Sequence, residues 1–157
     1  MSKVWASCLL FPLAVIVSAG CGGGRPALKL PDAVPASGTV TVDDKPLAKA
    51  LIFFIPTGLK VKGPGSSAVT DDNGKYELVT VVSGKSNPGA IPGEYRVWIS
   101  SLIGPDGKAI VPDGKTAPAN LAAREALPPR FSDVMNSELK ASVGAEGGTF
   151  DFKVSPK

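Results

Sequence analysis

The sequence predicts an all-β fold, a β-sandwich of about seven short strands. Three observations favour it. Apolar and polar residues alternate over several short segments, as they do on strands with one buried face. The chain contains 18 glycines and 15 prolines, which suits many turns between short strands. Its 157 residues, less a removable leader, suit one domain that buries an adequate core.

Residues 1–20 have the features of a removable signal peptide. Lys3 supplies a positive charge, an apolar stretch spans residues 9–17, and the three residues ending at Gly20 are small, as signal peptidase requires. The apolar stretch is too short for a membrane span, which needs about 20 predominantly apolar residues. We therefore expect cleavage between Gly20 and Cys21.

The segment Ser18-Ala19-Gly20-Cys21 resembles the lipobox of bacterial lipoproteins, whose last residue is the acylated cysteine. The resemblance implies that Cys21 receives a diacylglyceryl group and a further fatty acid such as palmitate. Two or more acyl chains anchor a protein stably, whereas one is marginal. Gly22 follows in place of Asp, which by the enterobacterial sorting rule favours the outer membrane over the inner. The alternative is an ordinary secretory signal with a chance cysteine, which would give a secreted periplasmic protein.

Residues 21–37 predict a tether between the anchor and the domain. Three glycines follow Cys21, and prolines at positions 26, 31 and 35 occur without any apolar period. This composition is typical of a flexible start followed by a stiffer, extended segment. We assign the folded domain to residues 38–157.

Strands and turns alternate over the first half of the domain. The expected strands cover residues 38–43, 48–55, 66–70, 75–79 and 94–100. The continuous apolar run within the second of these suits a strand covered on both faces. Turns are expected at 43–46 and 71–74, where Asn73-Gly74 is a strong hairpin signal, and a Gly/Pro loop is expected at 83–93.

Residues 101–136 interrupt this rhythm and form a long insertion, a length that usually indicates function or flexibility. Within it, residues 118–127 predict a short helix that starts at a proline and is ended by Pro128 and Pro129. The last two strands, 139–143 and 150–154, are expected to form a hairpin around a glycine-rich turn.

Five motifs within residues 37–101 share one family pattern. They are Gly-Thr-Val at 38–40, Lys-Pro-Leu at 45–47, the apolar strand at 50–54, Thr-Asp-Asp-Asn-Gly-Lys-Tyr at 70–76 and Pro-Gly-Glu-Tyr-Arg-Val at 92–97. They are similar to the carboxypeptidase regulatory-like family, and especially to short bacterial lipoproteins that contain one such domain. The resemblance implies a transthyretin-like, Greek-key sandwich. It indicates a fold rather than a reaction.

The composition favours a protein that is not an enzyme and has no cofactor. The chain has no histidine, Cys8 lies within the signal peptide, and Cys21 would be lipidated, so the mature domain has no cysteine thiol. Ser-His-Asp and Cys-His catalysis and most zinc and haem sites are thereby excluded. The formal net charge is +3 and the charges are scattered, which does not indicate nucleic-acid binding.

Acidic residues suggest two further sites, each with a simpler explanation. Residues 71–73 offer oxygen ligands for Ca²⁺, but position twelve of that loop is Val82 and not Glu, so a tight turn is favoured and we predict no metal site. Glu94, Glu125 and Glu138 are the glutamates that could be paired with an aspartate for glycosidase chemistry, at a carboxyl separation of about 5–10 Å. Isolated acids are usually solvated surface.

Arg96 and Trp98 form the candidate binding surface. They lie on one face of the strand at 94–100, opposite the face that Tyr95, Val97 and Ile99 turn to the core. An exposed Trp beside Arg suits carbohydrate stacking or a protein interaction hot spot. The alternative, which we favour, is that the 101–136 insertion folds back over Trp98.

These observations predict a lipid-anchored protein of the cell envelope. Its non-catalytic β-sandwich would serve as an interaction or structural module, held to the membrane by the anchor and facing an envelope protein or a glycan. The competing hypothesis is a binding protein for an extracellular glycan or small molecule.

Overall fold

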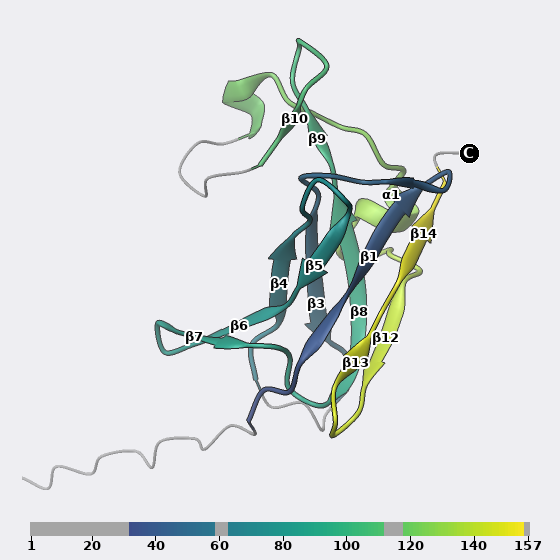
Figure 1. Ribbon diagram of the computed structural model, residues 1–157. Coiled ribbons are helices and arrows are strands. Elements are labelled where there is room, and N and C mark those ends of the chain that lie inside the picture. The colour runs from purple at the N-terminus through teal and green to yellow at the C-terminus, as the bar shows by residue number, and fades with distance from the viewer. Residues whose placement is uncertain (1–31, 59–62, 112–117, 156–157) are drawn as a thin grey trace, which may run out of the picture.

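The computed structural model describes residues 32–58, 63–111 and 118–155. Within them the chain is all-β, with two sheets packed face to face and a small third sheet beyond one end of the sandwich (Figure 1). The described chain begins at the end of the sandwich opposite to this small sheet (Figure 1). The predicted all-β sandwich is therefore confirmed.

One layer is a five-stranded sheet built around β1 within the described residues. One edge of β1 pairs in parallel with the last two strands, and its other edge pairs antiparallel with β5 and β2. The strands are β1 (Ala36–Val42), β2 (Lys45–Pro46), β5 (Lys75–Glu77), β13 (Gly148–Thr149) and β14 (Phe152–Val154). This pairing places the first and last strands of the domain side by side.

The other layer is a six-stranded antiparallel sheet in the order β12-β8-β3-β4-β6-β7, again counted over the described residues. The longest strand pairing in this sheet joins β3 to β8, and it places Phe53 opposite Trp98 and Phe54 opposite Val97. The strands are β3 (Leu51–Pro56), β4 (Ser66–Val69), β6 (Val79–Val82), β7 (Lys85–Pro88), β8 (Gly93–Ser100) and β12 (Lys140–Val143).

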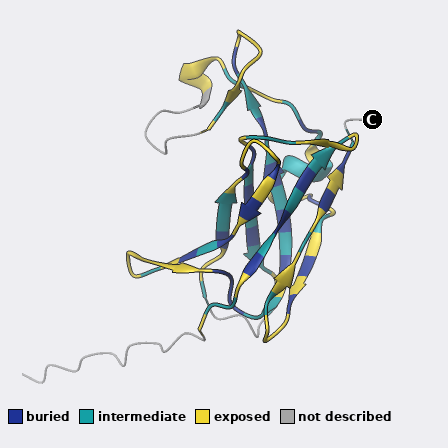
Figure 2. Ribbon diagram, viewed as in Figure 1, coloured by how far each residue is buried: buried dark blue, intermediate teal, exposed yellow. Residues whose placement is uncertain are grey.

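The core lies between these two layers and follows the alternation of the sequence (Figure 2). Ile52 and Phe54 on β3 are fully buried, while their neighbours on the strand are half-buried on the outer face. The Phe54 ring contacts aromatic rings from both layers, with centroids 5.7 Å from Tyr95 of β8 and 6.1 Å from Phe152 of β14. Burial of such rings is a main source of stability, so this cluster joins the two sheets.

The turn at 71–74 forms as predicted, but the strands on either side of it do not pair with each other. The Asp71 carboxylate accepts hydrogen bonds from the backbone N–H groups of Asn73 and Lys75, and Gly74 adopts a positive φ. β4 then pairs with β3 and β6, whereas β5 pairs with β1 in the other layer. The hairpin prediction is therefore wrong: this turn leads from one sheet to the other.

The predicted C-terminal hairpin is also wrong. β12 joins β8 in the six-stranded sheet, and β13 and β14 join β1 in the five-stranded sheet. The glycine-rich turn between them is present, with the Gly147 N–H donating to the Gly144 carbonyl. Both strands still turn their apolar side chains inward, because each covers the same core from an opposite side.

The insertion contains a small sheet in place of the predicted loop and helix. β9 (Leu102–Ile103) pairs with both β10 (Ala109–Ile110) and β11 (Arg124–Glu125). The helix predicted at 118–127 is only the 3₁₀ turn η1 (Pro118–Leu121), because Ala122 takes a positive φ of 49° and leaves the helical region. The α-helix α1 (Pro129–Ser132) instead begins at the prolines expected to end one, since proline suits the first helical position.

The predicted loop at 83–93 contains a strand. β7 returns antiparallel along β6 through a two-residue turn at Ser83 and Gly84, both with positive φ, as a tight hairpin turn requires. β6 pairs with β4 only at its first two residues, so the rest of this hairpin projects from the sheet (Figure 1). We refer to residues 79–88 as the arm.

Candidate functional site

The candidate surface lies on the outer face of the six-stranded sheet. Phe53 and Ile55 of β3 and Arg96 and Trp98 of β8 project from this face, because residues two apart on a strand share a side. All four are half-buried. The structure thus places Arg96 and Trp98 on one face, as predicted, and adds the apolar residues of β3 beside them.

Trp98 forms a stacked pair with Phe53, a partner that the sequence did not indicate. The ring centroids are 4.5 Å apart and the ring planes differ by 7°. Because each ring covers a face of the other, one flat face of Trp98 is taken by Phe53. A sugar ring needs a free aromatic face to stack on, so only the far face of either ring is available for such a ligand.

Arg96 is held by the end of the insertion. Its Nη1 donates a hydrogen bond to the Met135 carbonyl at 2.9 Å, and the Ser137 hydroxyl donates to the Val97 carbonyl. α1 also packs against β8. The insertion therefore does return to this strand, and it holds Arg96 through a backbone carbonyl rather than through an acidic partner.

Glu125 joins the insertion to the end of β8. Its Oε1 accepts hydrogen bonds from the backbone N–H groups of Ser101, Ala126 and Leu127, at 2.9–3.0 Å, and its Oε2 accepts one from the Ser100 hydroxyl at 2.6 Å. A carboxylate with this many donors is a strong local organiser. The sequence showed only an isolated acid here, since its donors are mostly backbone groups.

The other two glutamates are not brought into one cleft with Glu125. Glu94, at the start of β8, accepts a hydrogen bond from the Ser142 hydroxyl at 2.5 Å. Glu94 and the Glu125 contact at Ser100 lie six strand residues apart, or about 20 Å, beyond the separation that a glycosidase pair uses. Glu138 is exposed.

Two acidic residues, Asp71 and Asp133, stabilise local turns. Asp71 is occupied by the backbone of its own turn. The pKa of Asp133 lies below its usual range because its carboxylate accepts hydrogen bonds. The larger contribution comes from the Asn136 side-chain amide and a smaller one from the Met135 N–H. Among the residues the structure describes, no group of three or more Cys, Asp or Glu is placed to hold a metal ion.

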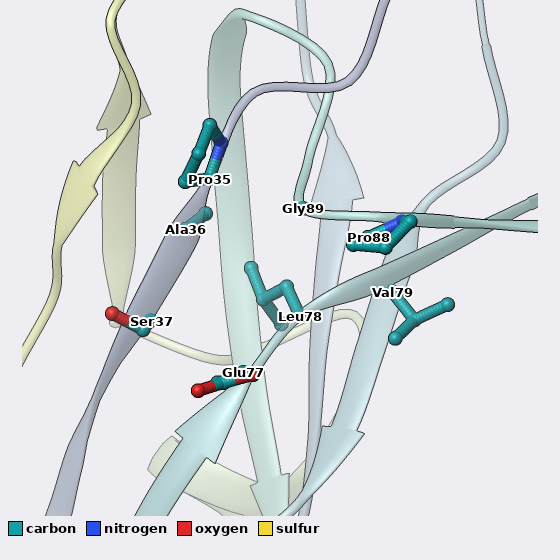
Figure 3. Close-up of a pocket in the computed structure, with 8 residues that line it drawn as sticks. All are labelled: Pro35, Ala36, Ser37, Glu77, Leu78, Val79, Pro88 and Gly89. Atoms are coloured by element: carbon teal, nitrogen blue, oxygen red, sulfur yellow. The ribbon is translucent and has the colours of Figure 1, made fainter.

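A cleft of about 400 Å³ lies where the chain passes from β5 to β6, and sequence reasoning missed it. Figure 3 shows its lining side chains: residues 35–37 and 88–89 flank residues 77–79. It exists because Glu77 pairs in one layer while Val79 pairs in the other, so the two sheets separate at Leu78. No residue pattern marks such a change of sheet.

Gly20 and Cys21, the predicted cleavage and lipidation residues, lie outside the described residues. Over the part of the chain that is described, no helix is long and apolar enough to cross a bilayer.

Comparison with known proteins gives little further guidance. No family model and no curated protein matches the chain. Among solved structures it is similar to a 9R-lipoxygenase from Cyanothece PCC8801, at 19% identity and a TM-score of 0.35. The match covers 80% of this chain and only 17% of the lipoxygenase chain.

This comparison corrects one expectation. The chain was expected not to be an enzyme, and the protein matched is an enzyme, so the exclusion of catalysis is withdrawn. A likeness of this degree carries no argument for lipoxygenase chemistry in this chain.

Proposed function

We propose that the chain is a lipid-anchored protein of the cell envelope whose β-sandwich is an interaction or structural module. The observation that supports this best is Cys21. It directly follows an apolar stretch and three small residues, and it is the one cysteine left once the signal peptide is removed. The outer membrane is favoured over the inner, since Gly22 and not Asp follows.

The arrangement of the domain suits display on a tether. The described chain enters at one end of the sandwich, and the insertion projects from the other (Figure 1). In the sequence, the motifs similar to the carboxypeptidase regulatory-like family all fall in the sandwich and none in the insertion. We therefore assign the sandwich to support and the insertion to contact with an envelope partner.

Lipidation is tested by metabolic labelling with palmitate and by detergent phase separation of the full chain. We expect the wild type to incorporate label and to enter the detergent phase, and Cys21→Ser to do neither. Cys8→Ser is the matched control, because it removes a cysteine from the signal peptide without altering the acceptor. An unlabelled, water-soluble wild type would contradict the anchor and favour a secreted periplasmic protein.

A second function is favoured by the stacked pair of Phe53 and Trp98. Two half-buried aromatic rings beside Arg96 are a composition typical of glycan or small-molecule sites. On this hypothesis the free face of one ring binds the ligand. A glycan array with the purified domain tests it, with Trp98→Ala expected to abolish any hit.

The matched control for that experiment is Phe53→Leu, which removes the stacking partner and leaves the indole. Loss of a hit in Trp98→Ala with retention in Phe53→Leu would support binding at the indole. An array without any hit, or a hit that Trp98→Ala does not change, would contradict glycan binding at this surface. The proposal of an interaction or structural module would then stand alone.

A further inference from the structure

The root of the arm is bonded to the entry point of the chain. Val34 and Ala90 exchange two backbone hydrogen bonds, of 2.8 and 2.9 Å, so the first described residues are bonded to the segment directly after β7. In addition, the buried Thr80 hydroxyl forms hydrogen bonds with the Gly89 carbonyl at 2.8 Å and with the Ser66 hydroxyl at 2.7 Å. The root of the arm is therefore fixed beside the point where the tether joins the domain.

The free part of the arm presents an apolar and cationic surface. Val81 is 53% exposed, and Lys85 at the turn is exposed. No acidic residue occurs between Glu77 and Glu94, so Lys85 is the sole charge of this stretch. Apolar side chains beside a lysine are the composition that favours the interface of a bilayer with anionic headgroups.

The opposite end of the domain lies far from the entry point. β8 has eight residues and leads from the entry side to the insertion, a distance of about 26 Å. The insertion also exposes apolar side chains, with Val111 and Leu121 at 41% and 37%, and its acidic Asp106 and Glu125 lie beside basic Lys108 and Arg124.

The length of the tether distinguishes the two ends further. Eleven residue steps separate Cys21 from Asp32, and they reach at most ~40 Å when fully extended. A chain anchored at Cys21 therefore keeps the entry end within that distance of the bilayer, and a relaxed tether brings it to the surface. It could bring the insertion there only by running nearly extended along the whole sandwich, at a large cost in conformational entropy.

We propose that the arm lies on the bilayer surface and that the insertion faces away from it. This orientation rests on the proposed lipid anchor and adds to it a second, protein-mediated contact with lipid. A single acylated residue leaves a domain free to rotate about its tether. A second contact with the same bilayer restricts that rotation, and it forms readily because the anchor already holds the domain at a high effective concentration near the lipid. The insertion is then held outward, where an envelope partner can reach it.

The test uses the full lipidated protein in vesicles of phosphatidylethanolamine and phosphatidylglycerol. Val81→Cys in the arm and Leu121→Cys in the insertion are each labelled with an environment-sensitive dye. The acylated Cys21 thiol does not react, so each variant carries one label. We expect headgroup-spin-labelled lipid to quench the dye at position 81 several-fold more than the dye at position 121.

A charge variant checks the lipid chemistry. Lys85→Glu should reduce quenching at position 81, and Lys108→Glu, at an exposed site in the insertion, should leave it unchanged. Equal quenching at both positions, or stronger quenching at 121, would overturn the orientation while leaving the anchor intact. Mass spectrometry of the N-terminal peptide separates the two failures, since an unmodified Cys21 would overturn the anchor and the orientation together.

Discussion

The sandwich and the insertion are held by different interactions. In the sandwich, buried aromatic and aliphatic side chains from two sheets meet around Phe54. In the insertion, Leu127 alone is a buried hydrophobic residue among those described, and Phe131 packs against the core while half-buried. Its other attachments include the hydrogen bonds of Glu125 and Arg96 with backbone groups. Apolar burial is cooperative across a core, whereas a few exposed polar bonds open locally.

This difference indicates that the two regions have separate stabilities. Loss of a core side chain should destabilise the whole domain, because both sheets depend on the same cluster. Loss of an attachment in the insertion should release that segment and leave the sandwich folded. A segment of low local stability is also the kind that can adapt to a partner.

The largest effect is expected from Phe54→Ala. Removal of a fully buried ring leaves a cavity between the sheets and should lower the free energy of unfolding by about 3–5 kcal/mol. Urea unfolding followed by tryptophan fluorescence measures it. The adjacent Phe53→Ala is the matched control on the outer face of the same strand, where the cost should be about 1–2 kcal/mol. Equal losses would show that the core is not centred on Phe54.

The next effect is expected from Glu125→Ala, which removes the acceptor of the Ser101 and Leu127 N–H groups, while the Ala126 N–H keeps its bond to the Ser101 carbonyl. We expect local opening of the insertion to become easier by about 1–2 kcal/mol, since the carboxylate is exposed and solvent partly replaces its bonds. Amide hydrogen exchange should accelerate at Ser101 and Leu127, while Val97 in β8, whose N–H bonds the Leu139 carbonyl, keeps its protection.

Glu125→Gln is the control for charge, because the amide oxygen can still accept from those N–H groups. It should accelerate exchange less than Glu125→Ala does. If exchange at Val97 increased as much as exchange at Leu127, the insertion and the sandwich would unfold as one cooperative unit and would not have separate stabilities.

The sequence predicted what is local and failed where pairing is long-range. Period-two alternation placed Tyr95, Val97 and Ile99 on the buried face, and all three are buried. The Asn73-Gly74 turn is present because its chemistry lies within four residues. The partners of the strands beside it depend on Thr70, whose hydroxyl bonds the Leu47 carbonyl and accepts from the Ala50 N–H, far away in the chain.

The candidate surface shows the same limit. Its strand face was predictable from alternation, but the Phe53 stack requires the register of β3 against β8, and the Arg96 bond requires the path of the insertion. The prediction of a helix at 118–127 was wrong for a local reason as well. Ala122 takes a positive φ that no composition rule assigns to alanine, and the Glu125 bonds then direct the chain along β9.

A smaller effect, with a pH signature, is expected from Tyr76→Phe in the sandwich. The Tyr76 hydroxyl donates to the Phe150 carbonyl at 2.6 Å, so its removal should cost about 0.5–1.5 kcal/mol. Burial, and then the negative charge of Asp151, raise the pKa of Tyr76 above its ordinary value of 10.0.

Because the folded protein retains this proton where the unfolded chain loses it, stability should fall as pH rises above about 10. Denaturant unfolding at increasing pH measures the decline, which Tyr76→Phe should weaken. The chain has two tyrosines, and burial raises the pKa of Tyr95 as well, so the remaining decline should disappear in the double Tyr76→Phe, Tyr95→Phe variant. A decline of unchanged size in Tyr76→Phe would contradict its assignment to this hydroxyl.

The smallest effect is expected from Lys108→Ala, which breaks the ion pair with Asp106 at the tip of the β9–β10 turn. The two charged atoms are 3.6 Å apart and both side chains are well exposed, at 84% and 59%. Exposed pairs of this kind contribute at most about 0.5 kcal/mol, so exchange throughout the insertion should stay close to wild type. In the same turn, the Asp106 carboxylate also accepts from the Lys108 N–H, a bond that alanine retains. If Lys108→Ala released the insertion as strongly as Glu125→Ala, ion pairing rather than the Glu125 bonds would hold this segment to the sandwich.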